Sequence, residues 1–265
     1  MKHRPKIGIT MRLELATRRF YLGRDYSEAV EAAGGVPFHL SLIADKDYIS
    51  SALDGLDGIL LPGSDSDVDP RYFDEEPHPA LGAVVPEKDE TEFLVIEEAE
   101  RRNLPVLAIC YGMQALNVAR GGSLIQDIAS MHDGPHKHQQ GLPLDRLSHS
   151  ITVEQQSLLA RFQSVRSKSA ELRVNSHHHQ AVNEIGRDLM VAARAKDGIV
   201  ECIQDTRGDR SVLGVQWHPE IAWQRDPLSA DIFNWFIGEC MTKSEFKSER
   251  LSDNSLSSNS LDLVG

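Results

Sequence analysis

The sequence predicts an α/β fold, a three-layer sandwich in which helices cover both faces of a mainly parallel β-sheet. Short apolar runs alternate with helical stretches through the first half of the chain. The run LPVLAI, residues 104–109, is almost wholly apolar, as central parallel strands usually are. The second half contains several short β runs separated by turns, which predict a mixed or antiparallel extension of the same sheet.

The elements of the first half follow from this alternation. Strands are expected at KIGIT, GVPFHLSL, DGILLPG and LPVLAI, which are residues 6–10, 35–42, 57–63 and 104–109. Helices are expected at residues 26–33, 45–53 and 89–102, and the first of these is stopped by Gly34 and Gly35. The segment from Gly63 to about Lys88 has no clear period, and a loop of this length in a compact domain is more often functional than accidental.

The second half is expected to end in a helix and a tail. The β runs are SHSITVEQ, ELRVNS, LMVAARA, GIVECIQD and SVLGVQW, and they precede a helix over residues 228–241 with an apolar face. Residues 243–265 are Ser-rich and polar, which is typical of a disordered segment. The division expected is therefore one domain over residues 1–242 and a disordered tail over 243–265, whose removal after Met241 should leave activity unchanged.

Composition excludes several classes of partner. The 265 residues are 40% hydrophobic with a formal net charge of −12, and Lys and Arg form no stripe that would suit a nucleic acid. No run approaches 18 apolar residues, so no membrane span is expected, and the N-terminus reads as a strand rather than a signal peptide. Cys110, Cys202 and Cys240 show no paired spacing, which indicates free thiols in a reducing cytoplasm.

The strand-to-helix junction VLAICYGMQALNVARGG, residues 106–122, predicts a nucleophile. Cys110 stands at a sharp turn between the strand and a helix, and Gly112 leaves room for that helix to start at once. A helix N-terminus favours the thiolate form of cysteine, and the amide of Tyr111 is expected to face the position of an oxyanion. A second donor is expected from the backbone of Gly63 and Ser64. A buried Cys at a strand end is otherwise most often a small core residue.

The segment GVQWHPE, residues 214–220, supplies a base and an orienting group for such a thiol. In an extended segment, side chains two residues apart face the same side, so His218 and Glu220 are expected to lie together. Pro219 biases His218 toward the extended region. Glu220 would then hold the imidazole while its other nitrogen meets Cys110. Alone, a His-Pro-Glu run also fits a surface histidine beside a turn.

At these residues the sequence resembles the class I glutamine amidotransferase superfamily, whose fold is flavodoxin-like. The stretches LPGSDSDVDPRYFDEEPHP, LNVARGGSLIQDI and VNSHHHQAV are similar to the peptidase C26 branch, the γ-glutamyl hydrolases that include γ-glutamyl-γ-aminobutyrate hydrolase. The resemblance covers residues 6–241. It implies a Cys-His-Glu catalytic triad at Cys110, His218 and Glu220.

The resemblance also implies further site residues. The oxyanion donors would be the amides of Gly63 and Tyr111, and Gln114 would help to hold the γ-glutamyl part of the substrate. Ser176 and His178 would line the pocket. The chain carries Tyr111 where many of these hydrolases have Arg. The run CYGMQ also occurs in the glutaminase domain of GMP synthetase. These two differences affect the assignment of the substrate and not the assignment of the chemistry.

Three other patterns raise the question of a ligand. Neighbouring residues in a strand point to opposite faces, so the consecutive histidines 177–179 are not expected to converge on one zinc ion. The acidic residues Asp65, Asp67 and Asp69 lack the spacing of a calcium loop and are expected to form a solvated loop or pocket rim. The pair Gly121-Gly122 follows the helix and reads as a turn rather than a phosphate loop. We expect neither a metal nor a cofactor.

The function predicted is a γ-glutamyl hydrolase that releases glutamate from small amine conjugates through a thioester on Cys110. One alternative is a glutaminase subunit that delivers ammonia to a partner synthetase. Another is a binding or regulatory protein that has kept the fold and lost turnover. The sequence leaves open which amine is released, which residue binds the substrate α-carboxylate, and whether the chain forms a homodimer.

Overall fold

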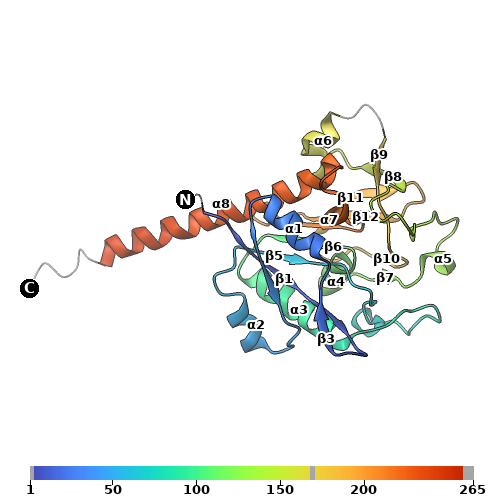
Figure 1. The fold of residues 1–265 in the computed structure, drawn as a ribbon, viewed down its shortest axis with the longest axis horizontal. Helices are drawn as coiled ribbons and strands as arrows, with labels where there is room; N and C mark the ends of the chain where they lie inside the picture. Colours follow the sequence, from blue (N-terminus) through green and yellow to red (C-terminus); the bar gives the residue numbers. More distant parts are fainter. Residues whose placement is uncertain (1–2, 168–170, 259–265) are drawn as a thin grey trace, which may run out of the picture.

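The computed structural model describes residues 3–167 and 171–258 and contains a nine-stranded mixed sheet (Figure 1). Five neighbouring strands run parallel, and the remaining four continue the sheet with antiparallel pairings. The strands in spatial order are β4 (Val36–Leu40), β1 (Lys6–Thr10), β5 (Gly58–Leu61), β6 (Val106–Ile109), β13 (Val212–Val215), β12 (Val200–Asp205), β11 (Leu189–Ala195), β8 (His149–Val153) and β9 (Leu172–Val174).

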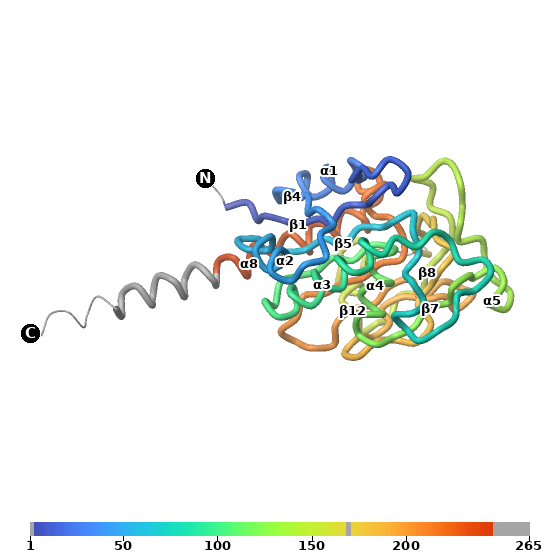
Figure 2. Tube along the Cα trace, turned by 90° about the horizontal axis from the view of Figure 1, so that it is seen from below, coloured from blue at the N-terminus to red at the C-terminus, as the bar shows by residue number. Residues whose placement is uncertain are grey.

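Helices cover both faces of the sheet. One face packs against α1 (Arg24–Ala32), α7 (Pro219–Ala222) and α8 (Pro227–Ser258), and the other against α2 (Lys46–Ala52), α3 (Pro86–Arg101) and α4 (Tyr111–Ala119). In Figure 2, α1 lies on one side of β1 and β5, and α3 and α4 lie on the other. Two separate apolar cores follow, one on each face, so the three-layer α/β prediction is confirmed.

Smaller elements were not predicted from the sequence. They are the hairpin β2 (Arg12–Glu14) and β3 (Arg19–Tyr21), the pair β7 (Leu124–Ile125) and β10 (Ala181–Val182), and the short helices α5 (Ile128–Met131), α6 (Gln163–Arg166), η1 (Pro70–Phe73) and η2 (Leu159–Arg161). Each spans two to four residues, which is too short for a hydrophobic period to show. The helix expected from Asp89 begins at Pro86, because proline is favoured in the first helical turn.

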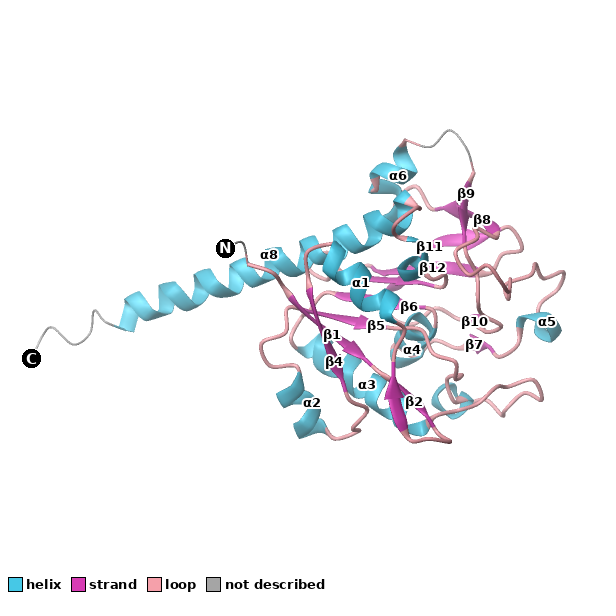
Figure 3. Cartoon of the chain, in the orientation of Figure 1, coloured by secondary structure: helices cyan, strands magenta, loops and turns pink. Residues whose placement is uncertain are grey.

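The final helix differs from its prediction. The sequence placed its end at Met241 and predicted disorder from residue 243, whereas α8 continues to Ser258 (Figure 3). The residues of this extension are good helix formers such as Lys, Glu and Leu, interspersed with Ser, and they contain neither Gly nor Pro. Residues 259–265 lie outside the described part of the chain, and the division into a domain and a tail stays a prediction.

Two other expectations bear on the described residues. No helix among them is long and apolar enough to cross a membrane. Cys110, Cys202 and Cys240 are all buried and none is in a disulfide, as their spacing predicted.

The parallel half of the sheet positions the predicted site. Strands β5, β6 and β13 are neighbours, and their register pairs Leu61 with Ala108 and Ile109 with Val215. Because parallel strands end at the same edge, the residues that follow them meet there. Gly63, Cys110 and His218 come one to three residues after these strands.

The turn after β6 depends on Gly112. A Cβ atom at this position would lie 2.2 Å from the carbonyl oxygen of Leu61 and 2.7 Å from its carbonyl carbon, which are backbone atoms that cannot rotate away. The elbow therefore packs directly onto β5, and only glycine permits this approach.

We expect Gly112→Ala to lower the free energy of unfolding by about 1–3 kcal/mol, since overpacking forces the backbone to shift. Gly238→Ala is the matched control: Gly238 is exposed within α8 and has no atom within 4 Å of an added Cβ, so this change should stabilise the protein slightly. Urea unfolding of both variants measures the difference. Equal stability for the two would show that the elbow does not require glycine.

Candidate active site

Cys110 occupies a strained turn. It stands between β6 and α4 with φ 52° and ψ −108°, a backbone conformation that residues other than glycine rarely adopt. Its amide donates to the carbonyl oxygen of Val215 on the neighbouring strand at 2.8 Å, which helps to hold the turn. The thiol is buried at the N-terminus of α4, where the helix dipole favours a negative charge on sulfur. The sharp strand-to-helix turn predicted at Cys110 is therefore present, and the role of its thiol as a nucleophile stays a prediction.

His218 and Glu220 lie together as predicted, although for a different reason. The Nδ1 atom of His218 is 2.6 Å from a carboxylate oxygen of Glu220, and both side chains are buried. The segment is not extended as expected: His218 caps α7, and Pro219 is the first residue of that helix. Proline has no amide hydrogen to lose at this position, which favours it at a helix start. His218 itself, before the proline, keeps a non-helical backbone with φ −113° and ψ 82°.

The imidazole faces both charges of the proposed triad. Burial alone would lower the pKa of His218, but the carboxylate of Glu220 and the Cys110 sulfur outweigh it, so the pKa is raised above its ordinary value. Cys110 is thus among the groups whose charge acts on the His218 ring. The carboxylate of Glu220 therefore favours the charged, imidazolium form of His218.

The backbone of His218 is held by Asn175, a residue that the sequence did not point to. The amide of His218 donates to Oδ1 of Asn175 at 2.8 Å, and Nδ2 of Asn175 donates to the carbonyl oxygen of His218 at 2.8 Å. Asn175 is 1% exposed, so both bonds are shielded from water. This two-point contact fixes the residue that carries the imidazole.

Gly63 and Tyr111, the two predicted oxyanion donors, both lie beside Cys110 and His218. The amide of Tyr111 is at the first position of α4, where helical amides have no partner within the helix. A Cβ atom on Gly63 would come within 2.9 Å of the His218 ring, so the glycine allows the close approach of the imidazole. The amide of Gly63 donates to the hydroxyl of Tyr26 at 3.0 Å.

The side chain of Tyr111 points away from the site. It is 1% exposed, and its hydroxyl donates to the carboxylate of Asp89 on α3. Burial raises the pKa of Asp89 to about 6. Its other carboxylate oxygen accepts from the amide of Asp69 at 3.1 Å, which ties the long loop to the elbow. The side chain of Tyr111, which stands where many of the γ-glutamyl hydrolases have Arg, thus packs beneath the turn that carries Cys110.

Arg12 and Tyr26 also belong to the site, and no pattern along the chain indicated them. Nε of Arg12 donates to the carbonyl oxygen of Gly63 at 2.6 Å, and its Nη2 donates to the hydroxyl of Tyr26 at 3.3 Å. Burial and the charge of Glu220 raise the pKa of Tyr26 well above its ordinary value, so the hydroxyl stays protonated. Both residues come from the N-terminal segment, far from the motifs in sequence.

The three residues predicted to bind substrate are all buried. Nε2 of Gln114 donates to the carbonyl oxygen of Gln180 and to the side chain of Gln216, each at 3.2 Å. The hydroxyl of Ser176 donates to the carbonyl oxygen of His138 at 2.5 Å. His178 uses Nδ1 at 2.8 Å from the Gln180 carbonyl oxygen. Each of the three thus has at least one polar atom engaged within the protein, and direct substrate contact by them stays a prediction.

The consecutive histidines diverge, as predicted. The His177 ring is 5.6 Å from the His218 ring, whereas Nε2 of His179 lies 3.0 Å from Asp67. His178 turns into a separate group with His138, His149 and Glu201, whose ligand atoms lie within 4.8 Å of one another. These four residues come from distant segments, so no spacing along the chain could have indicated the group.

The acidic loop and the glycine pair have structural contacts. Asp65 pairs with Arg12 at 3.2 Å, Asp67 accepts from the Gly82 amide at 2.6 Å, and Asp69 caps η1. Gly121 has φ +80° directly after α4, which is the turn predicted.

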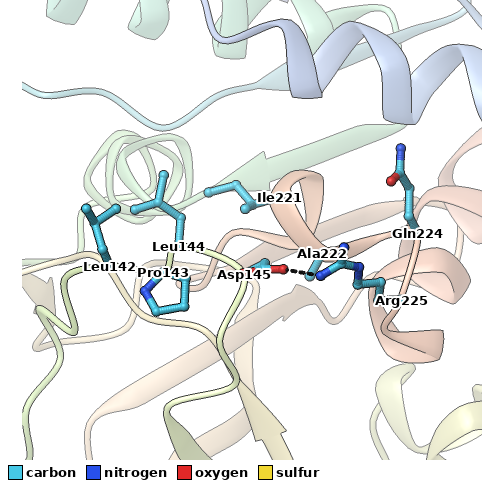
Figure 4. Close-up of a pocket in the computed structure, with 8 residues that line it drawn as sticks. All are labelled: Leu142, Pro143, Leu144, Asp145, Ile221, Ala222, Gln224 and Arg225. Atoms are coloured by element: carbon cyan, nitrogen blue, oxygen red, sulfur yellow. Dashed lines mark hydrogen bonds and ion pairs between the residues drawn. The ribbon is translucent and has the colours of Figure 1, made fainter.

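A pocket of about 380 Å³ lies beside the triad segment (Figure 4). It is formed by residues 142–145 on one side and by residues of and after α7 on the other, with an ion pair of 2.9 Å between Asp145 and Arg225 across it. Leu144 lines this pocket, and its carbonyl oxygen is 3.0 Å from Nε2 of His177. The His177 ring in turn lies against the His218 ring. Its lining contains no member of the triad, so it borders the site rather than containing it.

A comparison with solved structures bears on the fold. A solved structure described as a GMP synthase subunit from Thermoplasma acidophilum matches with a TM-score of 0.63 at 20% identity, over 94% of this chain and 100% of that chain. The two chains therefore share this fold.

Comparisons of the sequence identify the protein family. A family model described as peptidase C26 matches residues 5–220, so the chain belongs to the peptidase C26 family. A glutamine amidotransferase-like protein of Rickettsia prowazekii is 33% identical, and the alignment covers 83% of this chain and 92% of the relative. The γ-glutamyl-γ-aminobutyrate hydrolase of Escherichia coli (strain K12) is 34% identical over 227 residues, covering 83% of this chain and 86% of the relative.

The charge of Glu220 should set the titration of His218. In a Cys110→Ala background, adding Glu220→Gln should lower the pKa of His218 by at least about 1 unit, because a neighbouring opposite charge shifts a pKa by about 1–3 units. NMR titration of the imidazole resonances measures this, and the remaining histidines are the internal control. A His218 pKa that is the same in both variants would contradict the pairing.

Proposed function

We propose that this protein is a cysteine-dependent hydrolase that cleaves the γ-glutamyl amide bond of small amine conjugates and releases glutamate. The observation that carries the proposal is the approach of Cys110, His218 and Glu220 at the carboxyl edge of the parallel strands. The hydrolase of Escherichia coli supports the γ-glutamyl-γ-aminobutyrate type of substrate.

The first half of the reaction forms a thioester. His218 takes the proton of the Cys110 thiol, and the sulfur attacks the γ-carbonyl carbon of the substrate. The negative charge on the carbonyl oxygen is accepted by the amides of Gly63 and Tyr111. The Gly63 amide already donates to an oxygen atom, the Tyr26 hydroxyl, so the substrate oxygen must replace or join this acceptor. His218 then gives its proton to the departing amine.

The second half releases glutamate. Water attacks the glutamyl thioester while His218 accepts one of its protons, and the carbon–sulfur bond breaks to regenerate Cys110. Glu220 keeps the imidazole in one orientation and stabilises its charged form in both halves. The cycle needs only water beyond the conjugate.

Arg12 is the arginine that we propose for the α-carboxylate of the substrate. It contacts Gly63 and Tyr26 directly, and its side chain is 14% exposed. Its ion pair with Asp65 is the contact that a substrate carboxylate would compete with, and the Asp65 side chain is 71% exposed. A guanidinium suits a carboxylate because its donors match the two oxygens.

A second candidate is a glutaminase subunit that delivers ammonia to a partner synthetase. The relative from Rickettsia prowazekii, named as glutamine amidotransferase-like, favours this alternative. The chemistry at Cys110 would be the same, and only the leaving group and the partner would differ.

Glutamate release from γ-glutamyl-γ-aminobutyrate, glutamine and a γ-glutamyl peptide separates these candidates. We expect the conjugate to be hydrolysed with a kcat/KM at least tenfold above that for glutamine. Cys110→Ala should lower kcat by about 10³-fold or more, because the other triad members cannot replace the nucleophile. Cys202→Ala, which removes another buried thiol, should keep most of the activity. Faster hydrolysis of glutamine than of the conjugate would favour the glutaminase instead.

A further inference from the structure

Three buried histidines surround the carboxylate of Glu201, a residue of β12. Their nitrogens lie 3.2 Å (His138 Nδ1), 3.3 Å (His149 Nε2) and 3.6 Å (His178 Nε2) from the same oxygen atom of Glu201. The side chain of Glu201 is fully buried, and those of the histidines are between 2% and 8% exposed. Four polar groups thus converge in a region closed to solvent.

Hydrogen bonds among the four do not explain this convergence. The three facing nitrogens and both carboxylate oxygens of Glu201 have no hydrogen-bond partner. Charge-assisted N–H···O bonds are about 2.7–2.9 Å long, shorter than all three contacts. Buried polar atoms are rarely left without partners, so five together at one point indicate a missing binding partner.

The outer contacts of the histidines fix which nitrogen carries the hydrogen. Nδ1 of His178 lies 2.8 Å from the carbonyl oxygen of Gln180, and Nδ1 of His149 lies 3.4 Å from that of Ser150. Nε2 of His138 lies 2.9 Å from the carboxylate of Asp197. These oxygens accept hydrogen bonds, so the outer nitrogens carry the hydrogens. In neutral rings, the three inner nitrogens then direct lone pairs at a carboxylate, which is repulsive unless a cation lies between them.

We propose that His138, His149, His178 and Glu201 form a structural Zn²⁺ site. Bonds of about 2.0–2.1 Å in a tetrahedral site separate neighbouring ligand atoms by roughly 3.3 Å, close to the nitrogen–oxygen distances of 3.2, 3.3 and 3.6 Å. The ligand atoms as a set lie within 4.8 Å of one another, so the nitrogens would draw closer together around the ion. Three imidazoles and one carboxylate suit zinc better than magnesium or calcium, which prefer oxygen ligands. Four protein ligands fill a tetrahedral site, which is typical of a structural rather than a catalytic ion.

Asp197 provides the outer support that such sites have. Its carboxylate accepts from His138 and also from the amides of His136 and Ile199, at 2.8 and 3.3 Å. A carboxylate behind a metal-bound histidine orients the ring and increases its basicity. This contact does not depend on the ion and is already formed.

The proposed ion would hold together the segments that pack behind His218. It would join β8 and β12 to the loops that carry His138 and His178. Asn175, three residues before His178, holds the backbone of His218, and the carbonyl oxygen of Glu201 accepts from the amide of Gln216 at 2.8 Å. The ion would therefore be a positioning element for the imidazole and take no part in bond cleavage.

Metal analysis of the full chain, purified without a histidine tag and incubated with zinc, tests the proposal. We expect about one equivalent of zinc per chain after removal of excess metal. Stripping with a chelator should lower Tm by about 5 °C or more, and added zinc should restore it, because a ligand that binds only the folded state stabilises it. Cys110→Ala should keep the zinc, which separates this test from the proposed catalytic function.

Variants locate the ion. His149→Ala and Glu201→Gln should each lose most of the zinc, whereas His136→Ala, which changes an exposed histidine in the segment of His138, should keep it. If the variants do not fold, Co²⁺ bound to the unaltered protein should show the intense visible absorption of a tetrahedral site. Absence of zinc and cobalt binding to the unaltered protein, with an unchanged Tm, would overturn the proposal and indicate that a proton balances Glu201. Full retention of zinc by folded His149→Ala and Glu201→Gln would also overturn it.

Discussion

The parallel register of β5, β6 and β13 is the constraint on which the rest of the site depends. Leu61 pairs with Ala108 and Ile109 pairs with Val215, so three strands end at one edge although they are far apart in sequence. The bond from the Cys110 amide to Val215 and the contact of Gly112 with Leu61 then fix the elbow between its two neighbours. A shift of β6 or β13 by one residue would separate the thiol from the imidazole, and a shift of β5 would displace Gly63.

Buried polar contacts hold the parts of the site that the sheet does not reach. Asp89 connects the elbow to the long loop through Tyr111 and the Asp69 amide, and Asn175 connects the β9 side to the backbone of His218. Such contacts are costly to break because each would leave an unpaired polar group away from water. They explain why polar residues with no part in the chemistry lie deep in this protein.

The sequence predicted the features that local patterns encode. Apolar runs indicated the principal strands, and the Cys-x-Gly turn between a strand and a helix indicated the elbow. The pairing of His218 with Glu220 was also anticipated, although through an extended segment where the structure has a helix that starts at Pro219. The roles of Gly63, Tyr111 and Gln114 in binding or catalysis remain predictions.

Features that depend on distant segments could not be predicted in this way. Arg12 and Tyr26 reach Gly63 only because the N-terminal segment folds over the end of β5. The group around Glu201 draws its members from four separate segments between residues 138 and 201. The family resemblance placed His178 in the substrate pocket, and this stays a prediction; in the structure its inner nitrogen faces Glu201.

A single-turnover experiment tests the central claim most directly. Enzyme in excess over γ-glutamyl-γ-aminobutyrate is quenched with acid at successive times, and its peptides are mapped by mass spectrometry. The account predicts a glutamyl thioester on the peptide that contains Cys110, appearing as the amine is released and disappearing as glutamate forms. Formation of glutamate while the Cys110 peptide stays unmodified at every time, or a glutamyl adduct on another residue, would contradict it.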